Sequence, residues 1–192
     1  MTCRTKCSIC ETLQEYALEI VAHGGTAALS IDALAERSGL SPDVVRAHYP
    51  TAAACVYDAC DDASATLLGP VFDAFDDAVN WEEGFASATQ GLLAQLTANP
   101  LQARLWFIEA PCVDRELRRR CERRRRELVD FLTAKYERRR ESDRLSGVQI
   151  ELLVGASFHA ISEALAADDP DQLGRLGDNL AELAGVFEPA AA

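Results

Sequence analysis

Residues 30–49 read SIDALAERSGLSPDVVRAHY and predict two short helices joined by a tight turn. Ser30 and Ser41 each precede an apolar helical stretch, and a serine hydroxyl can accept one of the unpaired backbone N–H groups at a helix start. Gly39 lies between the helices, where a left-handed residue is favoured and glycine has no Cβ to oppose it. The expected inner face comprises Ile31, Leu34, Ala35, Val44 and Val45. This pattern is typical of a helix-turn-helix, whose two helices pack at a steep angle.

The composition favours an all-α fold. The chain has 192 residues, of which 48% are hydrophobic, and this is enough for a substantial core. Good helix formers abound, and no stretch alternates with the period of two that a strand would need. The net charge of −12 argues against a general nucleic-acid binder, and only residues 113–144 carry a basic excess.

Neither an export signal nor a membrane span is recognisable. Residues 150–167 form the most apolar long stretch, but this stretch is short and contains charged side chains. We therefore expect a cytoplasmic protein with no membrane partner. Its seven cysteines are expected to be reduced in that compartment.

Helix breakers divide the remaining sequence into about nine helices. We expect a head, residues 1–50, that contains the helix-turn-helix, and a larger helical body, residues 51–192, that follows without a linker. The expected boundaries within and between these parts are Gly24-Gly25, Pro50, Asn80, Asn99-Pro100, Pro111, Ser146-Gly147 and Asp168-Asp169-Pro170, and Gly69-Pro70 is expected to break or kink its helix.

Two stretches resemble the TetR family of transcriptional repressors. They are ALEIVAHGGTAALSIDALAERSGLSPDVVRAHYP in the head and ELLVGASFHAISEALAADDPDQLGRLGDNLAEL near the C-terminal end. The resemblance implies a homodimer whose last two helices form a four-helix bundle with those of its partner. It also implies an unknown small-molecule effector, bound in each body, that releases the dimer from a palindromic operator. No catalytic pattern of serine, histidine and acid or of metal ligands appears, so we expect no enzyme.

The resemblance and the helix caps together suggest which residues contact DNA. Arg46 and His48 would read bases or phosphates, Tyr49 and Thr51 would contact the DNA backbone, and backbone amides at helix starts would bind phosphates. The full expected set is Arg4, Lys6, Ser30, Ser41, Pro42, Asp43, Arg46, His48, Tyr49 and Thr51.

The DNA-binding prediction has an alternative. Similar proteins carry a phosphate-binding lysine near the start of the fourth helix, whereas this chain has only Thr51 and alanines there, and Asp43 would repel phosphate. A TetR-like dimer with weak or lost DNA binding, which senses a small molecule, a metal or thiol redox state, is therefore a second hypothesis.

Aromatic side chains suggest a ligand pocket in the body, and an apolar helix with small residues suggests a dimer interface. We expect the ligand pocket to include Phe72, Phe75, Trp106 and Phe107, because ligand pockets are mostly apolar. Residues 150–167 are apolar on nearly every face, which indicates that they are buried on two sides, one of them in a dimer. The expected dimer interface includes Leu152, Gly155, Ala156, His159 and Leu180.

The N-terminal cysteines and a run of arginines each allow two interpretations. Cys3, Cys7 and Cys10 would share one helical face, where they could bind a metal or an iron–sulfur cluster with Cys55 or Cys60, or sense redox state. We expect instead an arm of small residues, with no metal and no cofactor. Similarly, the basic run 118–126 is expected to be the solvated side of a helix paired at i, i+4, rather than a second nucleic-acid surface.

Overall fold

The computed structural model describes residues 7–137, 146–167 and 170–185, and these residues form helices and turns without a strand. The expected all-α fold is thus confirmed. The elements in chain order are α1 (Ser8–Gly24), the 3-10 turn η1 (Thr26–Ala28), α2 (Ile31–Ser38), α3 (Pro42–His48), α4 (Ala52–Asp77), α5 (Trp81–Ala98), α6 (Pro100–Arg104), the π-helical turn η2 (Leu105–Glu109), α7 (Ala110–Val113), α8 (Arg115–Glu137), α9 (Gly147–Ala166) and α10 (Pro170–Gly185).

The helix-turn-helix forms as the caps and the glycine predict. The Ser30 hydroxyl accepts a hydrogen bond from the Ala33 N–H at 3.0 Å, and Gly39 ends α2 in the left-handed conformation with φ of 69°. Val45 is fully buried, but Val44 is 38% exposed, so the expected inner face was wrong for Val44. Successive residues of a helix point about 100° apart, and a helix as short as α3 buries only one side.

One expected break within the body is absent, and another lies three residues later than expected. Helix α4 continues through Pro70, and the separation expected at Pro111 lies at the extended residue Asp114, between α7 and α8. Pro111 follows directly on the π-helical turn η2, so the helical run passes through the proline and ends only at Val113. Around Pro70, α4 buries Leu67, Leu68 and Val71, and this packing outweighs the hydrogen bond that proline cannot donate.

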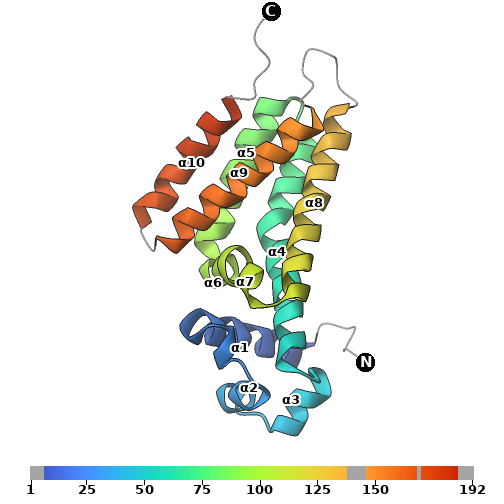
Figure 1. Cartoon of the computed structure of the whole chain (residues 1–192), viewed down its shortest axis with the longest axis vertical. Helices are drawn as coiled ribbons and strands as arrows, with labels where there is room; N and C mark the ends of the chain where they lie inside the picture. Colours follow the sequence, from blue (N-terminus) through green and yellow to red (C-terminus); the bar gives the residue numbers. More distant parts are fainter. Residues whose placement is uncertain (1–6, 138–145, 168–169, 186–192) are drawn as a thin grey trace, which may run out of the picture.

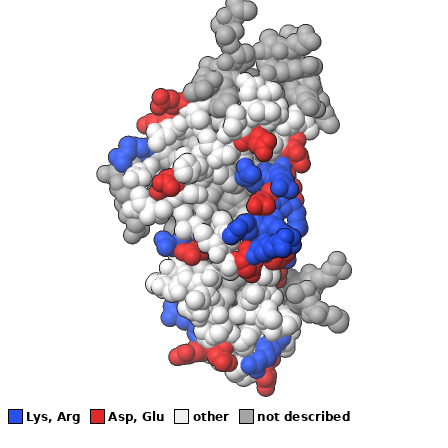
Figure 2. Space-filling model, in the orientation of Figure 1, with Lys and Arg blue, Asp and Glu red and all other residues white. Residues whose placement is uncertain are grey.

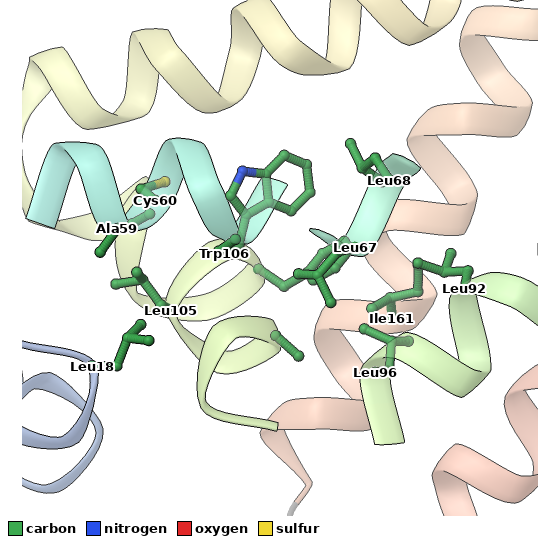
Figure 3. Packing of buried hydrophobic residues seen from close by; sticks show 14 of the residues in the cluster. Leu18, Ala59, Cys60, Leu67, Leu68, Leu92, Leu96, Leu105, Trp106 and Ile161 are labelled. Carbon is green, nitrogen blue, oxygen red and sulfur yellow. The ribbon is translucent and has the colours of Figure 1, made fainter. Parts of the chain in front are cut away.

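Long helices of the body stand above the head, which consists of α1, α2 and α3 (Figure 1). Side chains from α4, α5 and α9, together with Trp106, form the buried centre, and Figure 3 shows Leu67, Leu96 and Ile161 among them. The head packs directly on this core, because α1 contacts α4, α6 and η2, with Leu18 near Leu105. None of the described helices is both long and apolar enough to cross a membrane.

Candidate DNA-binding surface and ligand cavity

The outward side of α3 carries Arg46 between two carboxylates. Its guanidinium Nη1 lies 3.3 Å from Asp43 Oδ1, and its Nη2 lies 4.0 Å from Asp32 Oδ1 at the start of α2. All three side chains are exposed, so these pairs are weak and solvent competes with them. A phosphate could displace the carboxylates, but it would have to approach two negative charges to do so.

His48 and Tyr49, at the end of α3, face inward. Tyr49 is only 2% exposed, and its hydroxyl accepts a hydrogen bond from Gln14 Nε2 at 3.0 Å. Burial raises the pKa of Tyr49 well above its usual range. Tyr49 therefore does not lie on the expected DNA-facing surface but ties α3 to α1. The half-buried His48 has its Nδ1 close to the thiols of Cys7 and Cys10.

Hydroxyls cap three helices near the expected DNA surface. Besides Ser30, the Ser41 Oγ accepts from the Val44 N–H at 3.4 Å, and the Thr51 Oγ1 accepts from the Ala54 N–H at 3.2 Å. All three capping residues are exposed, as is Pro42. Contact of these residues with DNA stays a prediction. The expected arm contacts Arg4 and Lys6 lie outside the described residues, together with Cys3.

An apolar cavity of about 60 Å³ lies inside the body. Phe75 lines it, as expected, and so do Phe158 and the buried Leu180. Phe72 does not line it. Its ring packs edge-on against Phe131 with centroids 5.0 Å apart, and Arg124 lies over it at 4.9 Å. The main walls come from α4, α5, α8 and α9, including Leu68, Val71, Trp81, Phe85, Leu92, Leu128, Leu153 and Ile161.

A second and larger hollow, of about 290 Å³, opens beside this cavity. We call it the arginine hollow, and its lining comprises Trp106, Phe107, Pro111, Arg118, Cys121, Glu122, Arg125, Phe158 and Ser162. Trp106 and Phe107 thus lie on the hollow rather than on the apolar cavity. Phe158 borders both spaces, with its ring 5.3 Å from Trp106 and 5.4 Å from Phe107.

The lining of the arginine hollow contains both charged and apolar side chains. The π-helical turn η2 places Trp106 and Phe107 on its wall, and such turns recur at functional sites. Figure 2 shows basic side chains gathered on the face of the body over α8. Arg120 is held by Glu116 at 3.1 Å, as the i, i+4 spacing predicts, while Arg118 and Arg125 line the hollow.

Polar contacts connect the start of α8 to α4. The Tyr57 hydroxyl donates to Asp114 Oδ2 at 2.6 Å, and the Arg120 guanidinium binds Asp61. Although burial alone would raise it, the pKa of Asp114 is lowered by hydrogen bonds from the Leu117 N–H and the Tyr57 hydroxyl. These contacts join the helix that lines the hollow to the helix that follows α3.

The residues expected in a dimer interface divide into two groups. Leu152 is 58% exposed, Gly155 and Ala156 are half-buried, and His159 is exposed on the same helix, α9. Leu180, in contrast, is 2% exposed and lines the apolar cavity, so it is not available on the surface of a single chain. The physical reason is that the apolar stripe of α10 packs inward, against α9 and α5.

The N-terminal cysteines lie next to a histidine that their spacing in the sequence did not predict. Cys7 and Cys10 lie beside His48, which the sequence did not link to them, and the expected completion of a metal site by Cys55 or Cys60 stays a prediction. Cys60 lies 3.9 Å from Cys121, Sγ to Sγ, between α4 and α8. The C-x-x-C spacing at the start of α1 is a sequence signal for the two thiols, but nothing local links them to a histidine 38 residues later.

No family model and no curated protein sequence matches the chain, whereas solved structures do. A tetR-family regulatory protein from Rhodococcus RHA1 has a TM-score of 0.75 at 16% identity, covering 97% of this chain and 100% of its own. FadR from Bacillus subtilis in complex with stearoyl-CoA has 0.74 at 15%, covering 90% and 96%.

AibR in complex with isovaleryl coenzyme A and operator DNA has a TM-score of 0.72 at 14% identity, covering 95% of this chain and 100% of its own. These structures are similar to the chain over nearly their whole length, from the helix-turn-helix to the last helices of the body. The chain therefore has the fold of the TetR-family transcription regulators.

Proposed function

We propose that this protein is a homodimeric, ligand-responsive transcription regulator that binds operator DNA through α2 and α3. One observation carries the proposal. Helix α4 begins four residues after α3 ends and, without interruption, supplies Leu68, Val71 and Phe75 to the wall of the apolar cavity. A displacement of that wall is thereby transmitted to α3, the second helix of the helix-turn-helix, which we call the recognition helix. On this proposal the head is the DNA-binding domain, the body binds ligand and dimerises, and the protein acts in the cytoplasm as a repressor.

We infer that the effector is an acyl-CoA or a similar molecule with an apolar tail and an anionic head. The apolar cavity suits the tail, and Arg118 and Arg125 in the adjoining hollow suit phosphates. Two of the structurally similar regulators hold acyl-CoA ligands, which supports this assignment.

The size of the cavity suggests how the ligand acts. Ligand sites usually measure about 300–1,000 Å³, and the apolar cavity has only about 60 Å³. An acyl tail that passes Phe158 must therefore push its walls apart, including the wall formed by α4. The polar contacts from Asp114 to Tyr57 and from Arg120 to Asp61 would carry a movement of α8 to the same helix.

The proposed partner across α9 is a second copy of this chain. Val148 is 67% exposed and Leu152 is 58% exposed on neighbouring turns of this helix. Gly155 and Ala156 follow on the same side and would allow two helices to approach closely. A symmetric pair of heads is also what a palindromic operator requires.

Dimerisation is tested by light scattering after size exclusion. The wild type should have the mass of two chains. Leu152→Glu should be monomeric, because it places two charges in the apolar contact, and Val79→Glu is the matched control at an exposed valine outside the proposed interface. A monomeric wild type, or a dimeric Leu152→Glu variant, would contradict the assignment.

DNA binding and its release are tested with a sequence selected from random DNA by the purified protein. Titrating an acyl-CoA series should weaken binding to this sequence, and coenzyme A without a tail should not. Arg125→Ala should lower acyl-CoA affinity about tenfold, since a hydrogen bond between charged groups is worth about 1.5–3 kcal/mol. Arg119→Ala removes the same charge outside the hollow and should leave the affinity within about twofold.

The same experiment decides the alternative function. The carboxylates beside Arg46 favour a dimer that binds ligand but has lost DNA binding. If no sequence is enriched at low salt while acyl-CoA still binds, that alternative holds and the regulatory role is excluded. If neither DNA nor acyl-CoA binds, both proposals fail.

A further inference from the structure

Three donor atoms from distant parts of the head lie together. Cys7 Sγ and Cys10 Sγ are 3.3 Å apart, and His48 Nδ1 is 3.7 Å from the first and 3.5 Å from the second. Cys7 is the N-cap of α1, Cys10 lies in its first turn, and His48 is the last residue of α3. The packing of α3 against α1 therefore assembles the group.

The spacing of these atoms fits a tetrahedral zinc ion. With Zn–S bonds of about 2.3 Å and Zn–N bonds of about 2.0–2.1 Å, two sulfurs at the tetrahedral angle are about 3.8 Å apart, and a sulfur and a nitrogen about 3.5–3.6 Å. The observed separations lie within about 0.5 Å of these values, so small side-chain rotations would admit the ion. Thiolate and imidazole are the donors that zinc prefers over hard cations.

The surroundings of the group also suit an ion. The Cys10 N–H donates a hydrogen bond to Cys7 Sγ at 3.4 Å, the kind of contact that orients and stabilises a metal-bound thiolate. Cys10 is buried, while Cys7 and His48 are half-buried, so the group is only partly exposed to solvent. A fourth donor or a water would complete the tetrahedral coordination of an ion held by these three groups.

We propose that Cys7, Cys10 and His48 bind one Zn²⁺ ion in each head. The ion would join the start of α1 to the end of the recognition helix, and so fix the position of α3 on the head. This inference goes beyond the proposed regulatory function and does not depend on DNA or acyl-CoA binding. The same two thiols could instead form a disulfide, but that reaction would not use His48, and this difference separates the two possibilities.

Metal binding is tested on the reduced, metal-stripped full chain. Zn²⁺ is titrated in competition with a chromophoric chelator, and Co²⁺ is used as a spectroscopic probe, whose visible bands report tetrahedral geometry and thiolate ligation. We expect one ion per chain. Cys7→Ser, Cys10→Ser and His48→Gln should each lower Zn²⁺ affinity at least tenfold, while Cys112→Ser and His23→Gln, at an exposed cysteine and an exposed histidine, should not change it.

Thermal unfolding separates a loss of Zn²⁺ binding from a variant that simply fails to fold. Zn²⁺ at a hundredfold excess over its Kd should raise the Tm of the wild type by about 5–10 °C and leave the Tm of the His48→Gln variant unchanged. Circular dichroism of each metal-free variant establishes that it is folded. The proposal is overturned if the wild type binds no ion, if ion binding does not depend on His48, or if the ion binds without a cobalt–thiolate band. A Cys7–Cys10 disulfide that forms equally in wild type and His48→Gln, without metal binding, would assign the pair to redox chemistry instead.

Discussion

Asp43 is expected to weaken DNA binding, and its replacement by asparagine should strengthen it. The carboxylate is almost fully exposed in the first turn of α3, and it pairs with Arg46 Nη1 at 3.3 Å. Asparagine keeps the shape of the side chain but removes the charge. The change thereby removes a repulsion toward phosphates and frees the guanidinium of Arg46 from one of its two acidic neighbours.

Coulomb's law gives the size of the effect. A carboxylate about 6 Å from a phosphate in water is repelled by about 0.7 kcal/mol, which corresponds to about a threefold change in affinity. One such contact in each half-site gives about tenfold for a dimer. If each freed Arg46 also neutralises one phosphate, the dependence of log K on log salt concentration should steepen by about 0.9 per head.

Fluorescence anisotropy with the selected DNA sequence measures both quantities, at about 50 mM and 200 mM salt. Asp73→Asn is the matched control, because it removes an exposed carboxylate 21 residues into α4. At 1.5 Å per residue this site is about 30 Å along the helix, beyond the screening length of about 8–10 Å. Affinity that falls in Asp43→Asn would refute the reasoning and indicate that the carboxylate accepts a hydrogen bond from a cytosine.

Three further outcomes follow from the structure. Arg46→Ala should weaken specific DNA binding by about 1–3 kcal/mol in anisotropy titrations, and an unchanged affinity would exclude Arg46 as a contact. Tyr49→Phe should lower the free energy of unfolding in urea by about 1 kcal/mol, because it removes the hydrogen bond from Gln14, yet leave DNA affinity unchanged; a selective loss of affinity would contradict its buried position. At pH 8, iodoacetamide should modify the exposed Cys112 and spare Cys55, whose pKa burial raises to about 12, and mass spectrometry of the native protein would detect the opposite order.

Local rules determined the helix-turn-helix and many of the helix ends. Ser30, Ser41, Thr51 and Asn80 cap the helices that follow them, and Gly39 has the left-handed conformation that the turn requires. These features depend on contacts within a few residues, which is why the sequence reveals them. The same local rules predicted a break or a kink at Pro70, and the break does not occur, because α4 buries apolar side chains before and after the proline.

The candidate sites depended on tertiary structure. Sequence alone identified the aromatic residues of the body, but only packing divides Phe75, on the apolar cavity, from Trp106, on the arginine hollow, and turns Phe72 away from both. A side chain's direction within a buried cluster depends on residues far away in the chain, so periodicity does not predict it. For the same reason Leu180 points inward, although α10 as a whole could have offered it to a partner.

The sequence by itself determined that the fold is all-α, that a helix-turn-helix lies in the N-terminal part of the chain, and that two cysteines stand at the start of the first helix. Only the tertiary structure brought His48 to those cysteines, because the turn at Gly39 and the burial of Val45 and Tyr49 fix how α3 lies on α1. Local hydrogen bonds and helical periodicity depend on residues that are close together in the sequence. A contact across 38 positions comes only from the way in which the helices pack.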